Sequence, residues 1–333
     1  MRKILYSIGL MIVLFSCDSQ KVVSKQNNLP MPKSISQVAP PPKPEIKHKM
    51  EGEYFTMNIS DPTKSDNTIS YGSIVSAKPK GYKVTKKFFP SVGQNFRIRY
   101  IVLHYTALDH DKSVSVLTQQ SVSSHYLINE LDDKEIYQLV DENKRAYHAG
   151  ISSWRNDKML NDTSIGIEIV NSGYVVENNQ KVFFPYPEHQ YKKIALLVKD
   201  LVERYQIPMT NVLGHSDIAP TRKQDPGPLF PWKRLYEEYN IGMWYDEVTK
   251  NTYFNQLLTE DFVGQLQQAP FIFKVQTALK TFGYGIEQTG SWDDQTKRTI
   301  EAFQYHFRPS NYNGVLDAET WAILQALNQK YAK

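Results

Sequence analysis

Strand-like and helix-like segments alternate through the middle of the chain, and this alternation constrains the fold more than any other feature of the sequence. The run 97–105 (RIRYIVLHY) is rich in β-branched and aromatic residues, which is typical of a buried strand. The run 187–206 has apolar residues at three- and four-residue spacing, which predicts a helix with one buried face. Other strands are expected over 125–129, 135–140, 164–170 and 211–214, and another helix over 113–122. We therefore predict an α/β domain over residues 66–245, in which a mixed central sheet is flanked by helices.

A second folded unit is predicted over residues 262–333. It contains two similar runs, 290–296 and 314–320, each with Gly, then Asp three residues later, then Thr six residues later. Glycine favours a turn, and the aspartate can cap the first amides of a following helix. Helices are expected over 271–282, 294–307 and 318–329. These patterns predict a small three-helix domain.

The beginning of the chain has the features of a lipoprotein signal peptide over residues 1–17. Arg2 and Lys3 precede a short apolar run, 4–15, which is followed by Ser16 and Cys17. The run is shorter than the roughly 20 residues that span a bilayer. The tetrad 14–17 resembles a lipoprotein box, so we expect Cys17 to be the site of lipid attachment. Ordinary secretion with an unmodified cysteine is the alternative. Cys17 is the only cysteine, so this chain can form no internal disulfide.

Residues 18–65 are predicted to form a disordered tether. Prolines cluster between residues 30 and 44 among Lys, Ser and Gln, and large apolar residues are few. Behind a lipid anchor, such a spacer would hold the folded domains away from the bilayer. We therefore expect a membrane lipoprotein that faces the periplasm, with the outer membrane favoured. The formal charge of +4 is too small to predict binding to nucleic acid.

Three residues far apart in the chain have the chemistry of metal ligands. His104 lies at the end of a predicted strand, and His215 and Asp225 lie in a loop after another. Two imidazoles and a carboxylate, with a fourth position open, suit a catalytic zinc ion, which lowers the pKa of a bound water to about 7. Taken alone, His104 could be an ordinary hydrogen-bonded strand residue, and the loop 214–228 an ordinary proline-rich surface loop.

Two further residues are candidates for the chemistry itself. Glu168 shares one face of its predicted strand with Gly166, while three isoleucines occupy the other face. We interpret Glu168 as the general base, although a solvated strand residue would look the same. Lys223 lies two residues before Asp225, so an extended backbone would project both side chains the same way. We interpret Lys223 as a cation that stabilises an oxyanion; the alternative is a solvent-facing lysine.

Five segments occur in an order that resembles the zinc-dependent N-acetylmuramoyl-L-alanine amidases of the amidase-2 family. They are 102–106 (VLHYT), 123–128 (SSHYLI), 147–150 (YHAG), 164–168 (SIGIE) and 214–228 (GH through DPGP). The family is related to T7-type phage lysozyme and to the peptidoglycan recognition proteins, and the resemblance covers about residues 80–245. It implies zinc on His104, His215 and Asp225, with Glu168 and Lys223 in catalytic roles.

The last 70 residues resemble the peptidoglycan-binding type 1 domain. The features that match are the run Phe282-Gly283-Tyr284, the two Gly-x-x-Asp-x-x-Thr units and the pair Phe303-Gln304. An amidase domain, this module and a lipid anchor together resemble the lipoprotein members of the amidase family. The resemblance implies peptidoglycan or muropeptides as partners, and we expect a monomer.

His148 and Trp154 flank a polar loop, where an aromatic wall could contact the substrate. Packing or loop structure is the alternative role for each of them.

From these features we predict a peptidoglycan amidase that uses a zinc-activated water to hydrolyse the amide between N-acetylmuramic acid and the L-alanine of the stem peptide. Two alternatives stay open: a recognition protein without turnover, and a zinc peptidase that cuts within the stem peptide. The sequence leaves open the preference between intact wall and anhydro-muropeptides, and whether the C-terminal domain still binds peptidoglycan.

Overall fold

The computed structural model describes residues 79–82, 96–178 and 180–332. The predicted signal peptide with Cys17 and the predicted tether over 18–65 lie outside the described residues.

The predicted central sheet is confirmed, and it has the strand order β3-β2-β6-β1-β9. The strands β1, β2, β6 and β9 run parallel to their neighbours, and only β3 is antiparallel, on β2. Because the parallel strands end at the same edge, the residues that follow them gather there. The bounds are β1 Tyr100–Tyr105, β2 Tyr126–Ile128, β3 Tyr137–Gln138, β6 Ser164–Ile169 and β9 Val212–Gly214.

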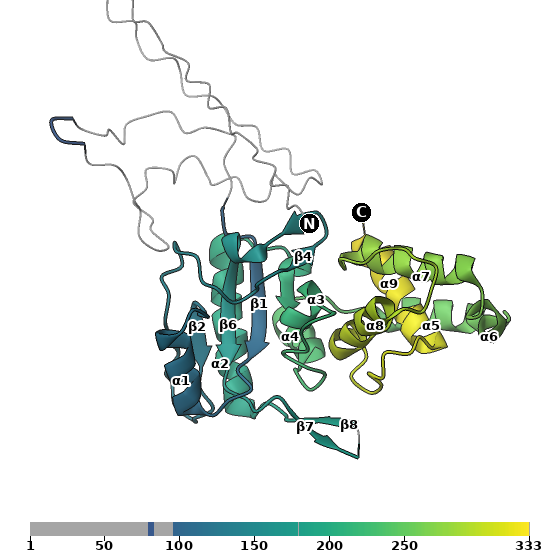
Figure 1. Cartoon of the computed structure of the whole chain (residues 1–333), viewed down its shortest axis with the longest axis horizontal. Helices are drawn as coiled ribbons and strands as arrows, with labels where there is room; N and C mark the ends of the chain where they lie inside the picture. Colours follow the sequence, from purple (N-terminus) through teal and green to yellow (C-terminus); the bar gives the residue numbers. More distant parts are fainter. Residues whose placement is uncertain (1–78, 83–95, 179, 333) are drawn as a thin grey trace, which may run out of the picture. The chain divides into compact units, whose positions relative to one another are not determined.

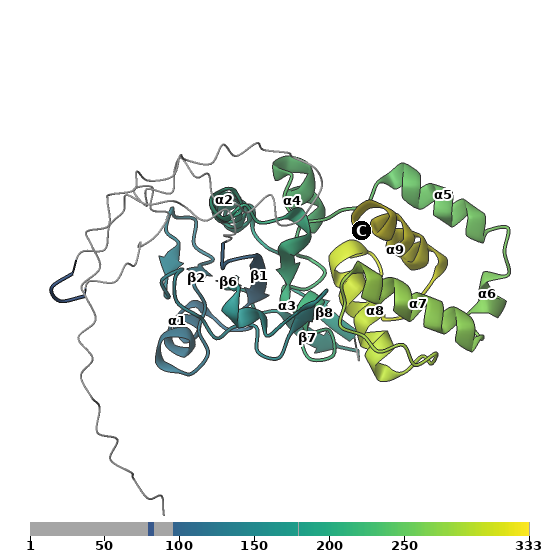
Figure 2. The same ribbon diagram turned by 90° about the horizontal axis from the view of Figure 1, so that it is seen from above.

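Helices cover both faces of this sheet (Figure 2). Helices α2 (Glu188–Tyr205) and α4 (Trp232–Tyr239) lie on one face, and α1 (His110–Gln119) lies on the other. The apolar positions of α2 are buried in one core with the isoleucines of β6, as the periodicity predicted. Helix α2 begins after Pro187, which is extended, and ends at Gln206, which adopts a left-handed conformation.

Several short elements were not predicted from the sequence. They include a two-stranded hairpin, β7 with β8, whose valines are largely exposed, and a smaller pair, β4 with β5. A single helical turn, α3, follows β9 directly and begins at His215. The bounds are α3 His215–Ile218, β4 Ser153–Trp154, β5 Asp157–Lys158, β7 Tyr174–Glu177 and β8 Gln180–Phe183, with 3₁₀ turns at Leu160–Asp162 and Met209–Asn211.

The three predicted C-terminal helices are present as α7 (Ala269–Phe282), α8 (Asp294–Phe307) and α9 (Ala318–Tyr331). Their predicted caps are also confirmed, because Asp293 accepts the amide of Thr296 and Asp317 accepts the amide of Thr320. Two more helices precede them, α5 (Glu247–Leu257) and α6 (Phe262–Gln265). Helix α5 runs beside α9 (Figure 2), where the Tyr253 hydroxyl donates to Gln329 at 2.8 Å.

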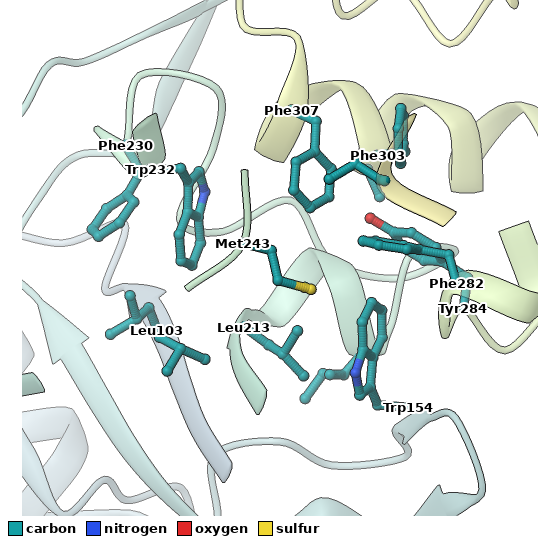
Figure 3. Close-up of a cluster of buried hydrophobic side chains, with 14 of the residues drawn as sticks. Leu103, Trp154, Leu213, Phe230, Trp232, Met243, Phe282, Tyr284, Phe303 and Phe307 are labelled. Carbon is teal, nitrogen blue, oxygen red and sulfur yellow. The ribbon is translucent and has the colours of Figure 1, made fainter. Parts of the chain in front are cut away.

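The central sheet and the C-terminal helices share one hydrophobic core. Figure 3 shows Met243 between Leu103, Leu213 and Trp232 on one side and the ring cluster of α7 and α8 on the other. Within the described residues, the α/β domain and the C-terminal helical domain therefore pack together as one compact unit. Among the described residues, no helix combines the length and the apolar character needed to cross a bilayer.

Candidate metal centre and active site

The sheet brings the candidate residues together at the edge where its parallel strands end. His104 and Glu168 are directly opposite each other in the register of β1 and β6. His215 comes immediately after β9, as the first residue of α3, and Asp225 follows in the next loop. His104, Glu168, His215, Lys223 and Asp225 all line one cavity of about 250 Å³.

The three predicted metal ligands converge through one atom each. The Nδ1 atoms of His104 and His215 are 2.9 Å apart, and each lies 2.9–3.0 Å from Oδ2 of Asp225. Within the described part of the chain, these three buried side chains form a group that could hold a metal ion. Their mutual spacing suits a common ion at about 2.0–2.2 Å from each ligand atom, as zinc requires.

The hydrogen bonds behind the two histidines fix which nitrogen faces the site. Nε2 of His215 lies 3.1 Å from the carbonyl oxygen of Ala149, which can only accept, so this nitrogen donates its proton there. Nε2 of His104 lies 3.0 Å from Nδ1 of His148. Nε2 of His148 lies 3.1 Å from the Ser164 hydroxyl, which itself donates to the carbonyl of Leu160.

That chain of donors gives one consistent set of tautomers. Because Ser164 uses its proton on Leu160, His148 donates to Ser164 from Nε2 and accepts from His104 at Nδ1. His104 therefore carries its proton on Nε2, and its Nδ1 presents a lone pair to the site. Metal-binding histidines are typically held in this way by a partner on the outer nitrogen. Three lone-pair atoms within 3.0 Å of one another repel without a cation between them, so these residues fit a divalent metal ion.

The electrostatics of the ligands support the same state. Burial and, to a smaller extent, the neighbouring His215 lower the pKa of His104 to about 4. Burial acts to raise the pKa of Asp225, but His215 and His104 hold it well below its usual range. Near neutral pH the site therefore offers a neutral His104 and an ionised Asp225, which are the forms that bind a metal.

Glu168 has the environment of a general base. Its Oε2 is buried and has no hydrogen-bond partner among the described residues. The pKa of Glu168 is raised to about 8, chiefly by burial and also by the charge of Asp225, while Lys223 opposes the rise. A carboxyl group that titrates near neutral pH can both take up and release a proton in one reaction cycle.

The loop that carries Asp225 and Lys223 is tied to α3 and to β9. The amide of Ser216 donates to the carbonyl of Asp225 at 2.9 Å. A Cβ on Gly214 would lie 2.7 Å from Cδ of Pro226, so the close packing of the loop against β9 requires glycine there. The hydroxyl of Tyr186 donates to the carbonyl of Pro226 at 2.8 Å and supports the loop from the other side.

His148 lines the cavity, but both of its ring nitrogens are bonded to protein groups. This arrangement favours the role of holding His104 over contact with substrate. Its ring also requires Gly166, because a Cβ there would lie 2.3 Å from Cγ of His148.

The suggestion that Trp154 forms an aromatic wall for substrate is wrong. Its side chain is 0% exposed, and its indole nitrogen donates to the carbonyl of Thr210 at 3.0 Å. The ring packs edge-on against Phe282 and Tyr284 of the C-terminal domain. The sequence pattern placed Trp154 in a polar loop and contained no sign of the helices that cover it.

Sequence reasoning also missed residues that shape the site. Tyr147 lines the cavity with a 55% exposed side chain, so it presents an aromatic face at the entrance. Its position beside His148 was the available signal. The roles of Ser164 and Tyr186 had no signal in the sequence, because each acts on a residue distant in the chain.

Comparison with known proteins finds a matching family for the α/β domain and another for the C-terminal helical domain. Residues 94–228 match the N-acetylmuramoyl-L-alanine amidase family model, and residues 268–324 match that of a peptidoglycan binding domain. The chain is 43% identical over 247 residues to the N-acetylmuramoyl-L-alanine amidase AmiD of Escherichia coli (strain K12), covering 71% of this chain and 84% of that protein.

Solved structures are similar over most of the chain as well. The E. coli AmiD structure, in complex with the substrate anhydro-N-acetylmuramic acid-L-Ala-D-gamma-Glu-L-Lys, aligns with a TM-score of 0.67 at 39% identity, covering 77% of this chain and 97% of that one. AmpDh3 of Pseudomonas aeruginosa aligns with a TM-score of 0.63 at 39% identity, covering 78% and 100%.

Proposed function

This chain belongs to the N-acetylmuramoyl-L-alanine amidase family and cleaves the bond between muramic acid and L-alanine in peptidoglycan, and we propose that it does so with one zinc ion held by His104, His215 and Asp225. The observation that carries the metal assignment is that three lone-pair atoms, one each from His104, His215 and Asp225, lie within 3.0 Å of one another. A hydrogen bond holds the outer nitrogen of each histidine, and the backbone of Asp225 is bonded to α3. When bound, zinc supplies a Lewis acid that polarises the amide carbonyl and activates water.

Glu168 acts as the base and then as the acid. Its Oε2, which has no hydrogen-bond partner in the described part of the chain, takes a proton from the attacking water and returns it to the nitrogen of the leaving L-alanine. Lys223 lines the same cavity, and its ammonium group stabilises the negative charge that develops on the carbonyl oxygen. His148 keeps His104 in the tautomer that this arrangement needs.

The substrates are peptidoglycan and muropeptides. Two relatives of known structure were solved with anhydro-muramyl peptides, one with a tripeptide stem and one with a pentapeptide stem. We propose that Tyr147, exposed at the entrance of the cavity, contacts the substrate as it enters. All the site residues come from one chain, and we propose that the enzyme acts as a monomer.

Product analysis on purified sacculi tests the reaction and the metal together. Mass spectrometry should find stem peptides with a free L-alanine amine and glycans with a free lactyl carboxylate, and a chelator should abolish both. His215→Ala should lose zinc and activity. A chain that binds sacculi without releasing new amine would support a recognition protein, and cleavage only within the stem would support a peptidase.

We propose further that Cys17 carries a lipid that holds the enzyme on the periplasmic face of a membrane, with the outer membrane favoured. The support is the charged start, the apolar run and the single cysteine of the sequence. Membrane fractionation of cells that express Cys17→Ala tests this proposal. The variant should move to the soluble fraction, and an unchanged membrane association would contradict the anchor.

A further inference from the structure

A fully buried carboxylate lies two residues after the metal ligand His215. Asp217 is 0% exposed, and it accepts three hydrogen bonds at 2.8 Å. One comes from the amide of Gly214, at the start of α3. The other two come from the C-terminal domain, from the hydroxyl of Tyr284 and from Nδ1 of His306.

Through the Gly214 bond, Asp217 sets the geometry of α3. It caps the helical turn whose first residue is His215, and the next amide, Ser216, holds the carbonyl of Asp225. One turn of helix therefore carries one proposed zinc ligand and fixes the backbone of another. A shift of α3 would move both ligand atoms relative to His104.

The two partners from the C-terminal domain are themselves firmly held. The His306 ring is stacked between Trp232 and Phe307, with ring centroids 3.9 Å away on each side. Tyr284 is 1% exposed, and its strand-like backbone pairs with Trp154. A Cβ on Gly283 would lie 2.7 Å from the Trp154 ring, so the two domains approach each other as closely as backbone and ring allow.

Tyr284 and His306 satisfy the hydrogen-bonding capacity of the Asp217 carboxylate, which is buried in the catalytic domain. An ionised carboxylate removed from water is stable only when charged or polar donors satisfy it. The described catalytic domain supplies Asp217 with the Gly214 amide, and the two side-chain donors both come from beyond residue 280. Without them, Asp217 would turn toward water and release the cap of α3.

We propose that the C-terminal domain is a structural part of the metal centre, in which Tyr284 and His306 are positioning residues that hold α3, and with it His215 and Asp225, in the geometry that binds zinc. This inference rests on the proposed zinc site. It assigns to the peptidoglycan-binding module a second task, separate from any contact with the wall.

Zinc affinity of the full chain, measured by competition with a chromophoric chelator, tests the proposal. Tyr284→Phe removes one hydroxyl and keeps the ring, and His306→Phe keeps the stacking and removes the donor. We expect each to weaken zinc binding about tenfold, the lower end of the range for lost support of a metal ligand. Tyr305→Phe is the matched control, because Tyr305 is also buried, but its hydroxyl donates to Glu301 and accepts from Lys181 instead of contacting Asp217.

A fourth variant separates positioning from simple stability. His306→Asn places an amide donor near the position of Nδ1 but loses the stacked ring. If the proposal holds, His306→Asn binds zinc more tightly than His306→Phe, although the melting temperature ranks them the other way. If zinc affinity follows the melting temperature, or if no variant changes it, the proposal is overturned. A wild-type chain that binds no zinc would instead overturn the metal centre itself.

Discussion

At the scale of single residues, the chemistry depends on Glu168 being a carboxyl group, one oxygen of which has no hydrogen-bond partner among residues 79–82, 96–178 and 180–332. Glu168→Gln keeps the shape of the side chain and removes its ability to exchange a proton. We expect amide hydrolysis to fall by about 10²- to 10⁴-fold, the usual contribution of a general base, while zinc stays bound. Steady-state assays with a muramyl peptide, alongside metal analysis, check this. Near-normal turnover in the variant would exclude Glu168 as the base.

The raised pKa of Glu168 also predicts how pH affects the metal-free protein. The folded pKa is about 8, above the ordinary value of 4.5, so between these limits the folded state binds more protons than the unfolded state. This contribution therefore lowers stability as pH rises from about 5 to 8, by at most about 1.4 kcal/mol per pH unit.

Glu168→Gln removes that effect and leaves the other titrating groups in place. The variant should therefore gain stability over the wild type as pH rises from 5 to 8. Denaturant unfolding of both proteins in the presence of a chelator measures the difference. If the free energies of unfolding of the two proteins change in parallel across this pH range, the pKa of Glu168 is not raised in the folded state.

At the scale of elements, the close pairing of β6 with the loop that carries His148 depends on Gly166. In Gly166→Ala the new methyl group would lie 2.3 Å from the His148 ring, so the ring must shift, which disturbs its hydrogen bond to His104. We expect a loss of about 1–3 kcal/mol in the free energy of unfolding and zinc affinity about 10- to 100-fold lower.

Ile167→Val is the matched control on the same strand, because its side chain points to the opposite face. It should cost about 0.5–1.5 kcal/mol of stability without changing zinc affinity. Denaturant unfolding and chelator competition, applied to both variants, separate the two effects. Wild-type zinc affinity in Gly166→Ala would argue against the support of His104 by His148.

The elements that could be predicted are those whose burial leaves a long pattern. Strands β1 and β6 are recognisable from their apolar runs, and α2 from its periodicity, so the faces that carry His104 and Glu168 followed from alternation alone. The pairs β4–β5 and β7–β8 have strands of two to four residues, too short for such a pattern. The turn α3 is shorter still, and only the position of His215 after a strand was foreseeable.

The parts of the site that could not be predicted are links between residues distant in sequence. His104 and His148 are 44 residues apart, and Asp217 is 67 residues from Tyr284 and 89 from His306. Nothing local marks such a bond. The ligands themselves were recognisable because their residue types and the order of their motifs resemble a family. Trp154 was misjudged for the same reason, since its burial depends on helices more than 100 residues away.

At the scale of the whole molecule, the shared core predicts that the catalytic domain is not stable alone. A chain that ends at Tyr245 would expose Trp154, Leu213 and Met243, which are buried in the intact protein. Each large apolar side chain contributes about 1.5–3 kcal/mol when buried, and the total stability of a domain is about 5–15 kcal/mol. We expect this fragment to aggregate or to melt well below the full chain.

Thermal denaturation followed by circular dichroism, together with size-exclusion chromatography, checks the fragment. The control is a chain that lacks residues 1–65, which should melt as the intact protein does because the predicted tether carries few large apolar residues. A fragment ending at Tyr245 that stays monomeric and melts like the full chain would show that the shared core is dispensable.

The buried carboxylate of Asp217 limits how far this enzyme can be rebuilt from exchangeable parts. A chimera that replaces the last 70 residues with an unrelated sugar-binding module would bring new specificity but no counterparts of Tyr284 and His306. Asp217 would then lose the two side-chain donors that it has in the intact protein. Re-targeting this amidase to another polymer therefore requires grafting the new recognition surface onto the outer helices while these two side chains are left in place.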